Sequence, residues 1–155
     1  SGLFLQILLM LVGAAPGSTG GGMKITTMSV LLLTSVAIFK NSLRTEAFGR
    51  TIPGDVIRNA TTIAFMYLSV CMLSGMFISL YEKVPLLSAC YETASAIATV
   101  GLTLGITPSL RHVSHLLLIA LMYIGRVGGL CLIYAVFPNA NPDRGSLVEE
   151  KVNVG

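Results

Sequence analysis

Two short stretches of this chain, beginning at Gly17 and Gly101, share the pattern Gly-x-Thr-x-Gly, and each follows a half-length apolar run. A short descending helix, a glycine-bearing loop and a spanning helix together form a re-entrant pore loop. The backbone of such a loop can line a path through a membrane. Because the unit occurs twice, the chain is expected to build its pore by internal repetition.

The composition places the chain in a bilayer. Apolar residues make up 54% of the sequence and charged residues only 11%, whereas a soluble domain carries about 25% charged residues. The net charge of +3 and the absence of tryptophan give no basic, aromatic surface for nucleic acid. The cysteines at 71, 90 and 131 lie in apolar segments without zinc or redox spacing, so we expect them to pack as small apolar residues. No cofactor is expected.

The apolar runs predict an all-α membrane protein. Residues 3–16 are too short to cross and are expected to form a half-helix of about 21 Å that ends at Pro16-Gly17. The run 25–39 is expected to reach a full crossing with Met23, Lys24 and Lys40 flanking it. After a polar loop, the remaining segments are a spanning helix at 60–81, a half-length helix at 86–98, a spanning helix at 113–138 and a polar tail at 139–155.

Basic residues predict the orientation. The loop 40–59 carries four of them, so it is placed in the cytoplasm. The helix 60–81 then runs outward, the segment 86–105 dips in and returns, and 113–138 runs inward. The sequence opens without a charged leader, and its first run is too short to cross, so we expect the chain to begin inside a repeat of a longer protein.

The two glycine loops supply candidate ligands for a cation. Glycine lets carbonyl groups turn toward an axis without a side chain in the way, and carbonyl oxygens can replace the hydration shell of potassium. The predicted ligands are the carbonyls of Ala15, Pro16, Gly17, Ser18, Thr99, Val100, Gly101 and Leu102. For a single loop, a glycine-mediated helix contact would be the better interpretation. Two matching loops favour a filter.

The glycine run before Lys24 also resembles a phosphate-binding loop. That motif needs lysine directly after the last glycine and a strand before the loop, but Met23 intervenes and no strand is predicted. Nucleotide binding is therefore kept as a remote alternative.

Two charged residues lie within apolar segments. Arg126 is in the middle of the predicted helix 113–138, where a lipid-facing arginine is costly, so we expect it to face a cavity and, as a cation below a cation filter, to affect permeation directly. The alternative is a structural arginine that caps carbonyls. Glu92 precedes Gly101 by nine residues. It is expected to support the pore loop, bonded to loop amides or to Lys24 or Arg111, in preference to holding cations at the mouth. His112 and His115 have no third ligand nearby in sequence and are interpreted as interface residues.

These residues resemble a known family. Residues 13–24, GAAPGSTGGGMK, look like the third pore loop of the Trk/Ktr/HKT potassium transporters, and residues 95–102, SAIATVGL, look like the fourth. Gly125-Arg126 resembles the family's pore-facing basic residue. The tail 149–155 fits the membrane subunit of the bacterial Ktr system, which is the nearest resemblance.

The resemblance implies four M1–pore loop–M2 repeats around one pore. Residues 1–59 would hold the third repeat's pore loop, second helix and cytoplasmic loop. Residues 60–138 would form the fourth repeat, with M1 at 60–81, pore helix and filter at 86–105 and M2 at 113–138. Residues 139–155 would be a cytoplasmic tail. The gate would lie within 25–48 opposite Arg126, although 25–47 contains no glycine, which departs from the family pattern.

The implied function is potassium uptake by a multi-pass protein of the bacterial cytoplasmic membrane, not catalysis. Implied partners are the N-terminal half of the same transporter, a second full subunit in a homodimer and a cytosolic nucleotide-binding ring. The alternative within the class is a sodium-permeable or weakly selective cation transporter.

Overall fold

The computed structural model describes residues 2–18, 20–40, 45–47 and 50–128. Five α-helices make up most of this part of the chain: α1 (Gly2–Leu11), α2 (Ile25–Phe39), α3 (Gly54–Glu82), α4 (Leu86–Ile97) and α5 (His112–Val127). The strands β1 (Glu46–Ala47) and β2 (Arg50–Thr51) form a small antiparallel hairpin in which Glu46 pairs with Thr51. A single 3₁₀ turn, η1 (Thr107–Ser109), precedes α5.

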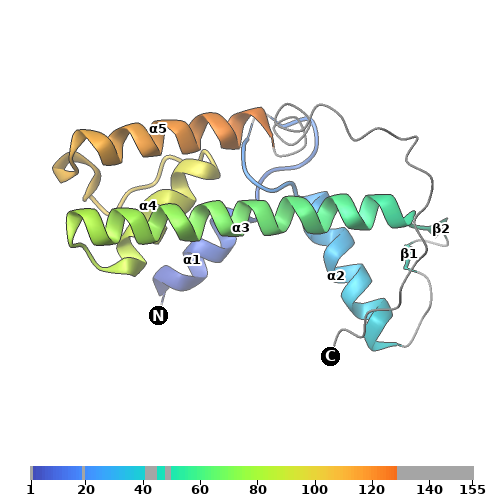
Figure 1. The fold of residues 1–155 in the computed structure, drawn as a ribbon. Helices are drawn as coiled ribbons and strands as arrows, with labels where there is room; N and C mark the ends of the chain where they lie inside the picture. The colour runs from blue at the N-terminus through green and yellow to red at the C-terminus, as the bar shows by residue number, and fades with distance from the viewer. Residues whose placement is uncertain (1, 19, 41–44, 48–49, 129–155) are drawn as a thin grey trace, which may run out of the picture.

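The half-length helix α4 is at the centre of the fold. It packs against α3, α5 and α1 (Figure 1), and every residue from Ala89 to Ile97 is buried. Alanine, serine, cysteine and threonine dominate this stretch, and such small side chains let membrane helices approach closely. A Cβ added at Gly75 of α3 would lie 2.7 Å from the Cys90 Sγ. The helix 86–98 expected from sequence is therefore observed, within one residue.

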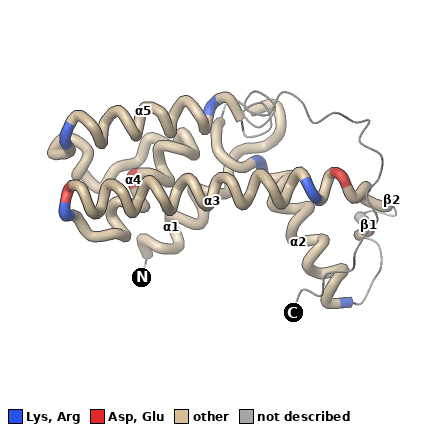
Figure 2. The backbone as a smooth tube through the Cα atoms, viewed as in Figure 1, with Lys and Arg blue, Asp and Glu red and all other residues tan. Residues whose placement is uncertain are grey.

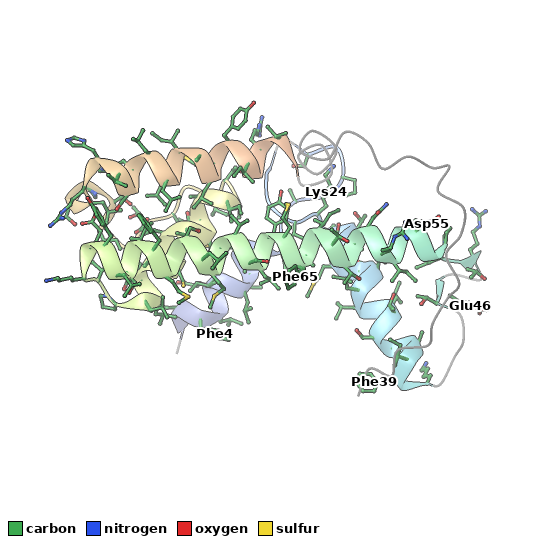
Figure 3. All side chains as sticks on the ribbon, in the orientation of Figure 1. Phe4, Lys24, Phe39, Glu46, Asp55 and Phe65 are labelled. Carbon is green, nitrogen blue, oxygen red and sulfur yellow. The ribbon has the colours of Figure 1, made fainter. Side chains whose placement is uncertain are left out.

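The helix α2 leans away from this centre. It contacts α3 near its own N-terminus and diverges toward Phe39 (Figure 1). None of its residues is buried, and Phe39 is 87% exposed. In Figure 3, Phe39 and Phe4 point away from the rest of the described chain. Exposed apolar surfaces of this kind are typical of contact with lipid or with further helices.

Only α3, among the described helices, is long and apolar enough to cross a membrane. It begins at Gly54, six residues before the predicted start at 60, because Pro53 precedes it at a position where proline favours a helix start. The expected full crossing over 25–39 is not observed. Lys40 caps α2, so its 15 residues span about 22 Å.

Two other predicted helices end early. The first run was expected to stay helical to Pro16, but α1 ends at Leu11 because Val12 pairs with Met23 instead. The helix expected over 113–138 ends at Val127, where Gly128 takes a φ of +86°. This places Arg126 in the last turn of α5 and not in mid-helix. Residues 129–138 and the tail 139–155 lie outside the described residues.

The cysteines behave as predicted where they are described. Cys71 and Cys90 are free and buried, while Cys131 lies outside the described residues. Charged positions gather toward the ends of α3 and α5, as Figure 2 shows for the described chain. Among the described helices the exception is Glu92, which lies buried within α4. The other helical charges lie near helix ends, as expected of segments in a bilayer.

Candidate functional site

The first loop, residues 12–24 apart from Thr19, is closed at its base by backbone hydrogen bonds. The Gly13 amide donates to the Met23 carbonyl at 2.7 Å, and the Ile25 amide donates to the Ala14 carbonyl at 3.3 Å. A Cβ at Gly13 would lie 2.6 Å from the Gly21 oxygen. The two ends of the loop therefore meet so closely that only glycine fits at this position.

The second loop, residues 98–111, is held by a carboxylate. Glu92 is only 4% exposed and reaches this loop from α4. Its Oε1 accepts hydrogen bonds from the Thr103 hydroxyl at 2.7 Å and the Leu104 amide at 2.9 Å. Its Oε2 accepts from the Thr107 hydroxyl at 2.8 Å. Such charge-assisted bonds are stronger than neutral ones.

The hydrogen-bond partners of Glu92 bear on its two possible roles, which are support of the pore loop and cation binding at the mouth. Neither Lys24 nor Arg111 forms an ion pair with it among the described residues; the described ion pair is Arg58–Asp55 on the surface of α3. Its contacts are with the loop that follows its own helix. They fit a supporting residue better than a cation ligand at the mouth, because three donors already occupy its oxygens.

The two loops contact each other directly. The Gly21 amide of the first loop donates to the Thr99 Oγ1 of the second at 2.7 Å. The next amide, of Gly22, donates to the Gly125 carbonyl in α5 at 3.4 Å. A Cβ added at Gly21 would lie 2.6 Å from the Thr99 side chain and 2.8 Å from the Gly125 oxygen. These contacts join segments that are far apart in the sequence.

Gly125 makes the closest helix contact at this junction. A Cβ there would lie 1.8 Å from the carbonyl oxygen of Ile97, at the end of α4. The last turn of α5 therefore rests directly on the backbone that leads into the second loop. No other residue type fits this contact without moving a helix.

Both candidate filter glycines have a left-handed backbone. Gly17 has a φ of +85° and Gly101 of +82°, and a Cβ at either position would meet nothing within 4 Å. Glycine is needed there for its conformation and not for space. Thr99 also has a positive φ, of +54°. For a β-branched residue this conformation is an outlier, and it costs about 1–3 kcal/mol.

Most of the candidate carbonyls are available to a ligand. Within the described residues, the Ala15 carbonyl accepts a bond from the Ser18 amide at 3.0 Å. No bond from a described residue reaches the others, which are the carbonyls of Pro16, Gly17, Ser18, Thr99, Val100, Gly101 and Leu102. Carbonyls without partners are what a dehydrating cation site needs.

A cavity of about 430 Å³ lies between the loops. Its lining includes Thr99, Val100 and Leu102 of the second loop together with Gly13, Ala14, Gly20 and Gly21 of the first. The stretch Ala15–Ser18 does not line it, so the two predicted carbonyl sets do not face one cavity throughout. Gly13, Gly20 and Gly21 were not predicted as site residues, although the glycine run was visible in the sequence.

A second pocket, of about 300 Å³, lies on the other side of Gly20 and Gly21. Lys24 and Arg126 both line it, with Ser18 and Gly128, and none of its described lining residues is acidic. Figure 3 places Lys24 beside the first loop near the end of α5. The two exposed cations make this pocket electropositive.

The glycine run does not act as a phosphate cradle. Its amides are occupied within the chain: Gly20 donates to the Ser18 Oγ at 3.3 Å, Gly21 to Thr99 and Gly22 to Gly125. A helix, α1, precedes the loop where the phosphate-binding motif has a strand. The described part of the chain also has no group of three metal-ligating side chains, and His112 and His115 lie apart from both pockets.

Comparison with known proteins identifies a family and several named relatives. Residues 1–141 match the family model TrkH, described as a cation transport protein. The chain is 43% identical over 145 residues to the potassium/sodium uptake protein NtpJ of Enterococcus hirae, covering 91% of this chain and 32% of that protein. It is 35% identical over 133 residues to the Ktr system potassium uptake protein B of Bacillus subtilis, covering 86% and 30%. The chain thus spans about a third of the length of these relatives.

Proposed function

The chain belongs to the TrkH family of cation transport proteins, and from that membership we propose that it supplies two of four pore loops to a potassium uptake path. The carbonyls of Ala15–Ser18 and Thr99–Leu102 would replace the hydration shell of the ion. Potassium is then the transported substrate, and selection depends on the loop backbone more than on any charged side chain.

One observation carries this proposal. Gly17 and Gly101 begin the same Gly-x-Thr-x-Gly pattern in the two loops, both have a left-handed backbone with open space beside it, and most carbonyls around them accept no bond from a described residue. Structural glycines such as Gly13 and Gly125 instead lie against neighbouring backbone. Open space beside an exposed backbone that no side chain covers supports a role in which that backbone faces a ligand.

Arg126 is proposed to act below the filter. It lies in the last turn of α5, next to Gly125, and it lines the pocket on the far side of Gly20 and Gly21. A cation there raises the energy of a passing cation until it moves or is paired. Replacing it with alanine should raise potassium flux, whereas loss of the folded protein would favour the structural alternative.

A sodium-permeable transporter is the second candidate. It is favoured by the name of one relative, a potassium/sodium uptake protein. The two candidates share the site and differ in how strongly the filter rejects sodium.

The assembly around the chain is also a proposal. The missing repeats would come from the N-terminal part of the same transporter, two full subunits would pair, and a cytosolic nucleotide-binding ring would regulate them. Naming of relatives as parts of a Ktr system supports a multi-component assembly. We place the protein in the bacterial cytoplasmic membrane with the loop 40–59 inside.

The test compares two glycines of the second loop in the full-length protein. Gly101 and Gly105 have φ values of +82° and +86°, and a Cβ at either meets nothing within 4 Å. Gly101→Ser and Gly105→Ser therefore impose the same backbone strain, the first among the proposed carbonyl ligands at 99–102 and the second beyond them. Uptake of potassium against competing sodium should lose selectivity several-fold only in Gly101→Ser. Equal effects, or none, would contradict the filter assignment.

A further inference from the structure

Thr99 has a conformation that its residue type disfavours. Its φ of +54° lies in the left-handed region, which glycine and asparagine enter readily and β-branched residues rarely do. Gly17, Gly22, Gly101 and Gly105, the other described left-handed positions in the two loops, are all glycine. The threonine side chain is therefore expected to make an interaction that glycine, which has no side chain, could not make.

The contribution visible in the structure is the contact with the first loop. The Thr99 Oγ1 accepts a hydrogen bond from the Gly21 amide at 2.7 Å. A Cβ at Gly21 would lie 2.6 Å from both the Oγ1 and the Cγ2 of Thr99. The threonine thus touches the first loop with its hydroxyl and with its methyl group, and it does so at the rim of the cavity between the loops.

We propose that Thr99 is a positioning residue for cation selection, and that its side chain fixes the separation between the two pore loops. The hydroxyl holds the Gly21 amide, and the methyl group prevents a closer approach. This inference rests on the proposed function, because it gives Thr99 the task of setting the width of the path that the loops would line.

Backbone contacts alone leave this separation less well defined. The first loop has one other described bond near this point, from the Gly22 amide to the Gly125 carbonyl, and at 3.4 Å it is long. The bonds at the base of the loop, at Gly13 and Ala14, lie within the first loop and its neighbouring helix. Removing the Thr99 hydroxyl should therefore let the first loop move.

A second role for the same hydroxyl must be distinguished. A hydroxyl oxygen has two lone pairs, so Thr99 could also bind the cation directly. In that case its loss would change selectivity without moving the first loop. Separating the two roles requires a readout on the first loop that does not depend on transport.

The experiment uses the full-length protein with its cysteines replaced and a single cysteine at Ala14, which is half-buried in the first loop, lines the cavity between the loops and is not one of the proposed carbonyl ligands. Thr99→Val keeps the shape and the branched strain but loses the acceptor, and Thr99→Ser keeps the hydroxyl. Thr99→Ala serves where valine fails to fold. Thr62→Val is the matched control, because the Thr62 hydroxyl is exposed and bonds to its own helix at Arg58.

Two quantities are measured: the rate at which a methanethiosulfonate reagent modifies the cysteine, and the potassium-to-sodium preference of uptake. We expect Thr99→Val to raise the modification rate several-fold and to lower the preference several-fold, with Thr99→Ser and Thr62→Val near the parent. An unchanged modification rate in both Thr99→Val and Thr99→Ala would overturn the positioning role, whatever happens to selectivity. A native full-length protein that takes up no potassium would instead overturn the proposed function, and the modification rates would still decide the role of Thr99.

Discussion

The first loop is held mainly by backbone groups, whereas the second is held by a side chain. Gly13 and Ala14 close the first loop through amide–carbonyl bonds to Met23 and Ile25. The second loop depends mainly on the Glu92 carboxylate, which accepts from two hydroxyls and one amide, while Glu82 accepts from the Arg111 amide at the far end of the loop. Both loops nevertheless present a left-handed glycine beside open space.

This difference indicates which substitutions each loop can tolerate. Backbone bonds do not depend on side-chain chemistry, so the first loop is limited by space at Gly13 and Gly21. The second loop has more room, since a Cβ at Gly101 or Gly105 meets nothing within 4 Å. It is limited instead by the hydrogen-bonding capacity of the carboxylates that hold it, above all that of the buried Glu92. The two loops should therefore fail under different kinds of substitution.

The largest effect is expected from Gly13→Ala. Its Cβ would lie 2.6 Å from the Gly21 oxygen and 2.8 Å from the Met23 oxygen. Both atoms belong to the backbone, and the clash should cost about 1–3 kcal/mol. We expect a clear loss of thermal stability in detergent and of potassium uptake by the full-length protein.

The matched control for this change is Gly54→Ala. Gly54 begins α3, and a Cβ there meets nothing within 4 Å. It should leave both stability and uptake near the parent values. A Gly13→Ala protein as stable as Gly54→Ala would show that the first loop is not limited by space.

A smaller effect is expected from changes at Glu92. Glu92→Ala leaves the part-buried Leu104 amide without its acceptor, and because water can partly replace that acceptor the cost is about 1 kcal/mol. Glu92→Gln keeps the oxygen that serves Thr103 and Leu104, and its amide can donate to the Thr107 hydroxyl. Uptake should therefore fall strongly in the alanine variant and weakly in the glutamine variant.

Measuring both variants for surface level and for potassium affinity separates support from ion binding. If Glu92 bound cations at the mouth, glutamine would weaken potassium affinity about as much as alanine does. That outcome would remove the contrast between the two loops, because Glu92 would then not be the residue that supports the second loop.

The sequence predicted those parts of the fold that depend on local patterns. The bounds of α4 follow from Pro85 and from a run of small residues, and those of α2 from its apolar run before Lys40. The early end of α1 could not be predicted, because it results from pairing between Val12 and Met23 across the loop. The end of α5 at Gly128 was missed since its apolar pattern continues beyond that glycine.

The same distinction applies to the site. The repeated glycine motif identified both loops, and the support by Glu92 was among the stated alternatives. The contact from Gly21 to Thr99 joins residues 78 positions apart, and no local sequence pattern predicts it. The same holds for Gly125, whose role follows from an approach to Ile97 that only the packing of α4 on α5 creates.

The most direct test of the account asks whether both loops line one cation path. Ala14 and Val100 come from different loops and line the same cavity. Cysteines at both positions, in a full-length protein without other cysteines, should bind cadmium together and block potassium uptake reversibly. Each single cysteine should be blocked far more weakly, and potassium should protect the pair. Block of the pair no stronger than that of the better single variant would contradict a shared path.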